Sequence, residues 1–305
     1  MCRSRALVLG FEQKYHFTLA TVTCDALEIA TAEDDRLFTE ACARRDIACV
    51  EVAWDREDLP SRADAGVLRT PWNYHLRPDA FRAWLRRAAA AGPLFNDLET
   101  LLANIDKSYL IGLAAAGVRT APTHLVERGA SGADLAQIAS SRGWQRVVVK
   151  PAISANGYLT MQVETDAFDA GQRLLETILR ERAALVQPVM DDVYAGGERC
   201  LIFFDGSYSH GVVKRPFAID AAGTQPLEGR PDDIGLAQRA LSTLPSIPLY
   251  ARVDIVRDAS GAPCVMELEL VEPELYLRYA SGAADRFATA LRARLDAAYR
   301  SLHVG

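Results

Sequence analysis

Apolar and amphipathic stretches alternate over the first third of the chain. Short apolar runs at 19–24, 48–53 and 65–70 predict strands, and they are separated by stretches with helical periodicity at 33–45 and 78–91. Strands that alternate with helices are typical of βαβ units. We therefore expect about 80 residues of small, open, parallel sheet, which makes this an α/β domain.

The middle of the chain is less regular. Its pattern predicts a helix at 104–116, an extended stretch at 118–126, a helix at 131–142, a strand at 146–151 and an apolar run at 184–190. Pro188 interrupts the last of these runs, and proline is confined to the edges and ends of strands. This run is therefore expected to cross between two domains.

The last third predicts an antiparallel sheet. Two hairpins are expected, one at 200–214 with its turn at Asp205-Gly206 and one at 250–270, together with helices at 234–244 and 281–302. The stretch 217–235 is rich in Gly and Pro and is predicted to be a mobile loop.

The second hairpin carries an acidic patch. Side chains alternate between the faces of a strand, so Glu267 and Glu269 share one face, and pairing of the strands brings Asp254 and Arg252 to it. Three carboxylates in one place repel one another unless a cation lies between them, and Mg²⁺ prefers oxygen ligands of this kind. A solvated strand face is the alternative. Acidic residues are depleted in strands and the flanks are apolar, so the metal interpretation is favoured.

Two other segments concentrate polar chemistry. Lys150 ends a strand and precedes a loop of small residues, whose backbone N–H groups suit a phosphate, although the P-loop spacing is absent. Arg69, Trp72 and Asn73 lie at the end of a predicted strand, where ligands of open α/β sheets collect. They could form a substrate wall, or Trp72 could pack as a lid on the core.

Composition narrows the class of protein. The 305 residues carry a net charge of −6 and no long basic run, which argues against a nucleic-acid surface. The six cysteines are widely spaced, form no C-x-x-C motif and fit a reducing cytosol, so a cytoplasmic location is expected. No apolar run approaches the length of a membrane span, so no membrane association is expected.

The order of these motifs resembles the ATP-grasp superfamily over residues 19–300. The order is a lysine at a helix start, a second lysine before a small-residue loop, a Val-Gln-Pro-Val crossing strand, a Gly-Glu-Arg hairpin, and Asp254 followed by Glu267-Leu-Glu269 and Pro273. In the family the last motif reads Glu-x-Asn, and the Glu found here is still an oxygen ligand.

One subfamily, which includes the cycloserine-forming ligase that closes an O-ureido-serine ring, is more similar still. The shared segments are Val67–Tyr74, Asp106–Leu110, Gly197–Arg199, Phe204–Gly206, Ser209–Pro216 and Met266–Pro273. Two segments depart from it: Thr70-Pro-Trp-Asn73 replaces Ser-Thr-Trp-Asp, and Ile153-Ser-Ala-Asn156 replaces Val-Ser-Ala-Gly. Both departures fall where substrate or phosphate is expected.

The resemblance implies a role for each matching residue. ATP is expected to contact Lys107, Lys150, Ser154, Gly157, the Gln187–Val189 backbone, and Asp192 or its neighbour Asp191. Mg²⁺ is expected at Asp254, Glu267 and Glu269. The γ-phosphate or a substrate carboxylate is expected at the catalytic residues Lys214, Arg215 and Arg252, and the substrate at Arg69, Trp72, Asn73 and Glu272.

The resemblance also implies an ATP-grasp fold divided into an N-terminal extension (1–17), a parallel α/β domain (18–97), a lid (98–188) and an antiparallel-sheet domain (189–305). The expected function is an ATP- and Mg²⁺-dependent ligase. It would activate a carboxylate of an amino-acid-like substrate as an acyl phosphate and form a C–N bond, with ring closure as one version. An intermolecular ligase and an inactive ATP-binding regulator are the alternatives. A homodimer is left open.

Overall fold

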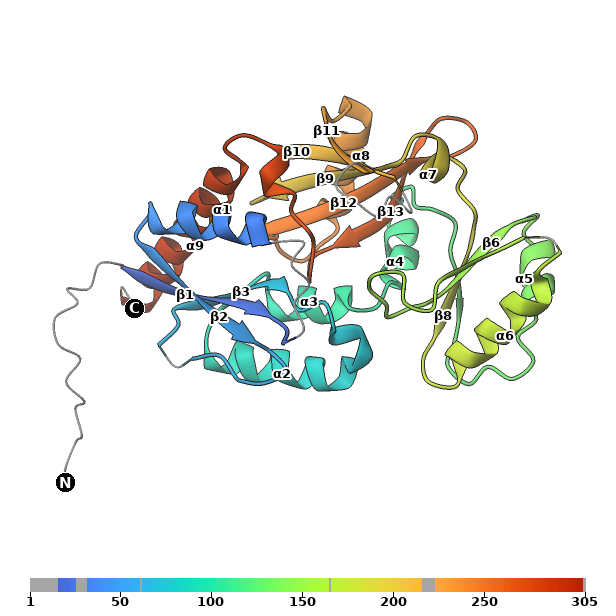
Figure 1. Cartoon of the computed structure of the whole chain (residues 1–305), viewed down its shortest axis with the longest axis horizontal. Coiled ribbons are helices and arrows are strands. Elements are labelled where there is room, and N and C mark those ends of the chain that lie inside the picture. Colours follow the sequence, from blue (N-terminus) through green and yellow to red (C-terminus); the bar gives the residue numbers. More distant parts are fainter. Residues whose placement is uncertain (1–15, 26–31, 61, 165, 216–222, 304–305) are drawn as a thin grey trace, which may run out of the picture.

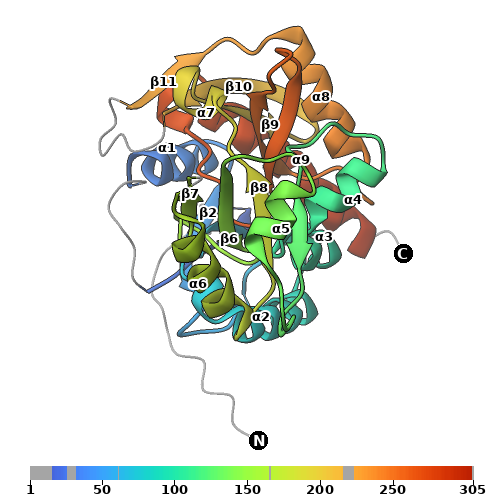
Figure 2. The same cartoon turned by 90° about the vertical axis from the view of Figure 1, so that its right-hand side faces the viewer.

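The computed structural model describes residues 16–25, 32–60, 62–164, 166–215 and 223–303. Three sheets follow one another along the long axis of the molecule (Figure 1). The parallel sheet and the five-stranded antiparallel sheet are packed together, and the third sheet forms a separate layer at one end. Figure 2, which looks at that end, shows the third sheet and its helices in front of the other two.

The N-terminal sheet is parallel, with the strand order β2-β1-β3-β4. Its elements are β1 (Phe17–Thr23), α1 (Ala32–Ala43), β2 (Ile47–Ala53), β3 (Ala65–Thr70), the short helix η2 (Tyr74–Leu76), α2 (Pro78–Ala91), β4 (Leu94–Phe95) and α3 (Leu98–Asn104). Helix α2 buries Phe81, Trp84, Leu85 and Ala88, which recur at helical spacing, so one face of α2 covers the sheet. The predicted parallel α/β fold is confirmed.

The end layer corresponds to the predicted lid. It contains β5 (His124–Val126), α5 (Leu135–Ser140), β6 (Val147–Pro151), β7 (Met161–Val163), α6 (Phe168–Leu179) and β8 (Ala184–Pro188). Its strands pair in the antiparallel order β5-β8-β6-β7. Helix α4 (Tyr109–Ala115), which precedes this layer, packs on the C-terminal sheet through Leu110 and Leu113. A Cβ on Gly171 of α6 would approach Val163 of β7 to 2.6 Å, so only glycine lets α6 lie this close to the sheet.

The C-terminal sheet is antiparallel, with the order β11-β10-β9-β12-β13. Its elements are α7 (Asp192–Ala195), β9 (Glu198–Phe204), β10 (Ser207–Lys214), β11 (Thr224–Leu227), α8 (Pro231–Ser242), β12 (Tyr250–Arg257), β13 (Pro263–Glu269), the short helix η4 (Leu277–Tyr279) and α9 (Ala283–His303). Alternate residues of β9 pack on opposite faces of the sheet. Leu201 and Phe203 belong to the cluster with α8, and Ile202 and Phe204 to the cluster with α9.

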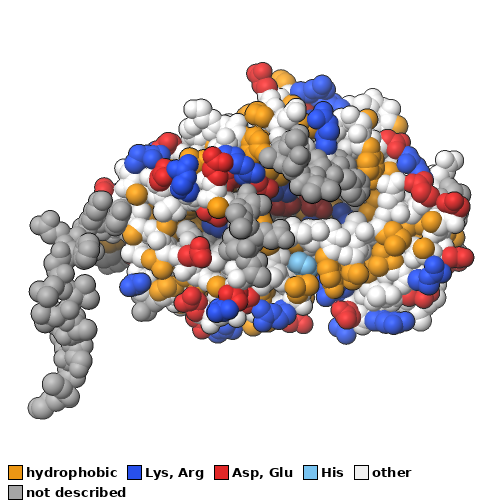
Figure 3. Space-filling model, viewed as in Figure 1, with side chains coloured by type: hydrophobic (Ala, Val, Ile, Leu, Met, Phe, Trp, Pro, Cys, Tyr) orange, Lys and Arg blue, Asp and Glu red, His pale blue; other side chains and the backbone are white. Residues whose placement is uncertain are grey.

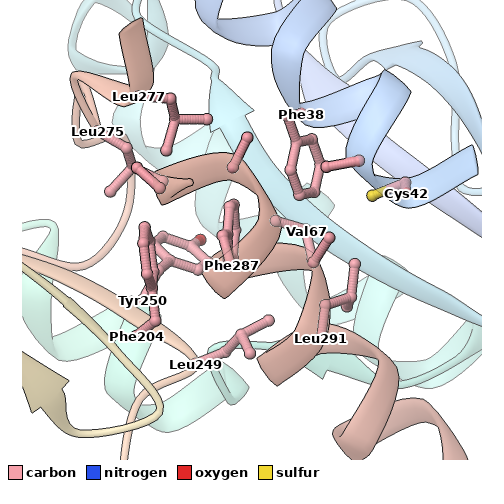
Figure 4. Close-up of a cluster of buried hydrophobic side chains, with 14 of the residues drawn as sticks. Phe38, Cys42, Val67, Phe204, Leu249, Tyr250, Leu275, Leu277, Phe287 and Leu291 are labelled. Atoms are coloured by element: carbon pink, nitrogen blue, oxygen red, sulfur yellow. The ribbon is translucent and has the colours of Figure 1, made fainter. Parts of the chain in front are cut away.

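A shared core joins the parallel and antiparallel sheets (Figure 4). The ring of Phe287 on α9 stacks on Phe38 of α1, with centroids 4.6 Å apart, and on Phe204 of β9, with centroids 4.8 Å apart. Stacked aromatic pairs add to the hydrophobic burial of the rings themselves. This packing holds two of the three layers as one scaffold, on which the site is built.

Several element predictions need correction. Strand β1 begins at Phe17, which was assigned to the predicted N-terminal extension 1–17 and not to a strand. Residues 1–15 lie outside the described part of the chain. The predicted loop 217–235 contains β11 and the start of α8; residues 216–222 lie outside the description. The helix expected at 131–142 is only α5, because Gly132 and the cap at Asp134 delay its start.

Helix α6 and strand β7 were not predicted. The domain boundaries stay predictions. Within the described ranges, no helix is both long and apolar enough to cross a membrane.

Candidate active site

A cavity of about 520 Å³ lies where the three layers meet. It collects many of the residues singled out by the sequence: Trp72, Lys107, Lys150, Ser154, Gly157, Lys214, Arg252, Glu267, Glu269 and Glu272. In the space-filling view, acidic and basic side chains gather in a hollow at the centre of this face (Figure 3). A polar, charged cavity of this size suits a charged ligand such as a nucleotide.

The acidic patch forms as the alternation predicted. Strands β12 and β13 pair so that Asp254 lies opposite Glu267 and Arg252 lies opposite Glu269. One carboxylate oxygen from each of Asp254, Glu267 and Glu269 lies within 4.8 Å of the others. Leu268, between the two glutamates, is buried on the opposite face of the strand. The hairpin therefore presents three oxygen donors at one point, which is the kind of donor set that Mg²⁺ prefers.

Two lysines hold Glu267. Lys107 Nζ lies 3.1 Å from Oε2, and Lys150 Nζ lies 3.2 Å from Oε1. Lys107 lies in the turn between α3 and α4 rather than at a helix start, and Lys150 is on β6 of the end layer, so two separate segments bring the cations to the C-terminal sheet. Burial would raise the pKa of Glu267, but the two ammonium groups outweigh it and hold that pKa well below its usual range.

Glu269 has the opposite environment. Burial, opposed by Arg252 and reinforced by Asp254, raises the pKa of Glu269 to about 8. Arg252 binds both oxygens of Asp254, with Nε to Oδ1 at 2.8 Å and Nη2 to Oδ2 at 2.9 Å, and its Nη2 also donates to Glu269. The guanidinium therefore supplies the positive charge that lets these carboxylates share one buried site.

Glu272 closes the wall nearest the parallel domain. Its carboxylate accepts a hydrogen bond from Tyr74 Oη at 3.0 Å, and its carbonyl accepts one from Trp72 Nε1 at 3.1 Å. Burial raises the pKa of Glu272. Trp72 is thus a cavity wall held by a hydrogen bond to the opposite domain, and the predicted substrate loop does reach the site.

The loop after Lys150 turns sharply beside the cavity. Asn156 and Gly157 have φ values of 51° and 69°, and Tyr158 N donates to Ala155 O at 3.0 Å. Two successive left-handed residues inside a four-residue turn are typical of type I′. Asn tolerates this conformation better than other residues with a side chain, which explains how Asn156 can stand where the related subfamily has Gly.

Three residues predicted for the nucleotide have partners of their own. Gln187 is fully buried and donates to Thr123, Val189 N donates to Arg146 O at 3.0 Å, and Asp192 accepts from Arg199 at 2.7 Å. None of the three lines the 520 Å³ cavity. Their roles toward ATP stay predictions.

Three further predicted residues also lie outside this cavity. Asn73 donates to Asp55 and accepts from Trp54, so its amide fixes a loop of the parallel domain. Arg215 is exposed. Arg69 lines a different, smaller pocket. Of the three expected catalytic cations, Lys214 and Arg252 reach the cavity, where Lys214 Nζ lies 2.9 Å from Glu198.

Several cavity residues carried no predicted role, among them Glu198 and Tyr276. Glu198 belongs to the Gly-Glu-Arg segment, and its place at the start of a strand that pairs with Lys214 was a usable signal. Tyr276 has a left-handed φ of 50°, and Arg252 lies 5.7 Å from the centre of its ring. Nothing in the sequence pattern indicates such a backbone conformation.

Comparison with known proteins places the chain in a family. A family model described as "D-cycloserine synthetase DcsG, N-terminal domain" matches residues 19–96. "Cycloserine biosynthesis protein DcsG" of Streptomyces lavendulae is 30% identical over 295 residues, which cover 91% of this chain and 98% of the relative. The chain belongs to the DcsG family. The resemblance inferred from the motifs is confirmed.

Solved structures agree with the DcsG assignment. The crystal structure of D-cycloserine synthetase DcsG superposes with a TM-score of 0.84 at 30% identity, over 91% of this chain and 99% of that one. D-Alanine–D-alanine ligase from Bacillus anthracis, complexed with ATP, gives 0.65 at 14% identity over 93% and 98% of the two chains.

A RimK-domain ATP-grasp protein from Sphaerobacter thermophilus gives a TM-score of 0.65 at 20% identity, over 89% of this chain and 98% of that one. The fold is ATP-grasp, and this DcsG-family protein is an ATP-dependent ligase that forms C–N bonds.

Proposed function

We propose that this enzyme activates a carboxylate of an amino-acid-like substrate as an acyl phosphate, with Mg²⁺, and closes a ring by C–N bond formation. The observation that carries the proposal is the pairing of Lys107 and Lys150 with Glu267, inside a cluster of three carboxylates. Phosphoryl transfer between two anions needs cations on the phosphates and a metal site beside them. Lys107, Lys150, Glu267 and Glu269, which could serve these purposes, line the same cavity.

The three carboxylates fit a magnesium ion by their chemistry and spacing: Asp254, Glu267 and Glu269 would hold it. Bound there, Mg²⁺ would neutralise charge on the phosphate oxygens and orient them. Lys107 and Lys150 would then bind phosphate oxygens instead of Glu267, because the metal ion would balance the negative charge of that carboxylate. Lys214 and Arg252, which also line the cavity, would bind the substrate carboxylate or the γ-phosphate.

The proposed reaction balances without a protein nucleophile. A substrate carboxylate oxygen attacks the γ-phosphorus, the bond to the β-phosphate oxygen breaks and ADP leaves. A nitrogen of the same substrate then attacks the acyl carbon, inorganic phosphate departs and the nitrogen loses a proton. The described lining residues include neither Cys nor His, in keeping with a reaction that proceeds by positioning and electrostatics.

Membership of the DcsG family supports ring closure over the joining of two substrates. The departures at Pro71, Asn73 and Asn156 fall in the segments expected for substrate and phosphate, so the identity of the ring is a separate question. A non-catalytic role is disfavoured, because each lysine and carboxylate expected for catalysis is retained and most of them meet in one cavity.

The test is to incubate the protein with ATP, Mg²⁺ and single amino-acid derivatives, including ureido and hydroxamate types, and to follow ADP by coupled assay and the product by mass spectrometry. Ring closure predicts ADP release with one compound alone and a product lighter than that compound. ADP release only when two different amino acids are present would replace the proposal with intermolecular ligation.

A further inference from the structure

A second, smaller pocket opens in the parallel domain, with a volume of about 110 Å³. It lies beside Thr23 and Thr70, the last residues of β1 and β3, and is also lined by Arg69. From β1 the chain passes to β2 on one side and later to β3 on the other, so the strand order reverses between β1 and β3. In open α/β sheets, ligands bind at the carboxyl ends of the strands where the order reverses.

Arg69 is the unusual feature of this pocket. Its side chain is only 4% exposed, and Nη2 makes a single ion pair, at 3.2 Å, with Asp35 of α1. Within the described part of the chain, its buried Nε and Nη1 have no hydrogen-bond partner. A buried guanidinium nitrogen without a partner is costly, so these donors are expected to serve a ligand or water. Guanidinium is well matched to a carboxylate.

The rim of the pocket has the opposite charge. Glu51 on β2 is exposed and lines the pocket, and the carboxylate of Asp35 is 35% exposed beside it. A simple anion would be attracted by Arg69 but repelled by these two carboxylates. A ligand with an anionic and a cationic end would satisfy both. The hydroxyl groups of Thr23 and Thr70, 2.8 Å apart, offer further hydrogen bonds at the floor.

We propose that this Arg69 pocket binds the zwitterionic head group of a small α-amino acid, with its carboxylate at Arg69 and its ammonium at Glu51 and Asp35. The inference goes beyond the proposed reaction, because binding here needs neither ATP nor turnover. Thr70, at the end of β3, and Trp72, two residues further along the chain, line the small pocket and the large cavity, respectively. An amino acid held at Arg69 therefore sits next to the wall of the active site, as a second substrate or as an effector.

The experiment is calorimetric titration of the full chain without ATP, at constant ionic strength. Glycine, alanine and serine are the probes, with acetate and methylammonium as single-charge controls. Saturable binding of a zwitterion, at least tenfold tighter than either control, is the expected result. Glu51→Gln should weaken that binding at least fivefold, and Arg69→Gln should weaken it more. Glu40→Gln, the same change on α1 away from the pocket, should have no effect.

Arg69 is buried and paired, so Arg69→Gln could misfold. In that case the change in zwitterion affinity of the rim variant Glu51→Gln tests the proposal. Arg252→Lys, in the large cavity, separates the two sites: zwitterion binding should survive it. Binding that survives Glu51→Gln, or is lost in Arg252→Lys, would overturn the proposal, as would the absence of saturable zwitterion binding. These binding outcomes do not depend on whether ring closure occurs. Turnover of one amino acid that is stimulated by a second, and loses the stimulation in Glu51→Gln, would identify an effector; consumption of both would identify a substrate.

Discussion

Replacing Glu267 by Gln should have opposite effects on ATP binding and on turnover. In the protein without nucleotide, Glu267 accepts from Lys107 at 3.1 Å and from Lys150 at 3.2 Å, and its side chain is 20% exposed. Hydrogen bonds between charged groups contribute about 1.5–3 kcal/mol each. ATP must therefore compete with an internal carboxylate for both lysines.

The neutral amide of Glu267→Gln removes that competition. If about 1.5 kcal/mol of lysine pairing no longer has to be given up, ATP should bind roughly tenfold more tightly in the absence of Mg²⁺. Turnover with Mg²⁺ should fall at least ~100-fold, because a metal ligand is lost and metal ions contribute several kcal/mol to such reactions. Calorimetry with ATP and EDTA gives the first quantity, and ADP release gives the second.

Glu274→Gln is the matched control. Glu274 lines the same cavity, but its carboxylate pairs with Arg278 at 2.7 Å instead of the lysines. Its replacement should leave Mg²⁺-free ATP affinity unchanged. Weaker Mg²⁺-free binding of ATP to Glu267→Gln would refute the competition between Glu267 and ATP for the two lysines. Turnover that survives this change would refute the role of Glu267 as a metal ligand.

Three more changes test other parts of the site and fold. Arg252→Lys loses the two-point contact with Asp254 and should raise the substrate KM more than the ATP KM in steady-state assays; equal increases would remove its substrate role. Asn156→Val should raise the ATP KM by up to roughly tenfold, since a left-handed φ costs such a residue about 1–2 kcal/mol, whereas Asn156→Gly should stay near wild type. A similar KM for both Asn156 variants would contradict the turn geometry. His210→Gln should make urea-unfolding stability less dependent on pH between 7.5 and 5, and an unchanged dependence would contradict its buried, neutral state.

The sign of the His210 effect follows from its surroundings. Burial lowers the pKa of His210 from 6.5 to about 4, and Nε2 lies 3.0 Å from Leu275 O, so Nε2 carries the proton and Nδ1 accepts from Ser209. Arg286 also lowers the pKa, and Asp34 raises it. The unfolded chain therefore binds the extra proton first as the pH falls. The contribution of neutral His210 to the free energy of unfolding is fully present above pH 6.5 and is lost between pH 6.5 and 4. At pH 5 the loss is about 2 kcal/mol.

The acidic hairpin could be predicted because its information is local. Alternation along a strand places Glu267 and Glu269 on one face, and a Gly-containing turn brings Asp254 to them. The partners of Glu267 could not be found in this way. Lys107 and Lys150 lie 160 and 117 residues away from Glu267 along the chain, and only the tertiary fold brings the two lysines to this carboxylate.

Short polar side chains were the least predictable. Asn73 and Asp192 sit in motif segments, yet one joins Asp55 to Trp54 and the other holds Arg199 and the backbone of Arg257. A sequence does not distinguish a polar group that faces a ligand from one that satisfies a neighbour. Helix α6 was missed for a related reason. Gly171 lowers the helix propensity of this segment, and glycine is required there because a larger residue would collide with Val163.

The most direct test of the ligase account is magnesium-dependent ADP formation with single amino-acid derivatives, measured together with the mass of the product. The account predicts that one compound alone supports ADP release, that EDTA abolishes this release, and that the product has the mass of a closed ring. ATP binding without ADP formation for every compound, alone and in pairs, would contradict it and favour a protein that binds ATP without catalysis.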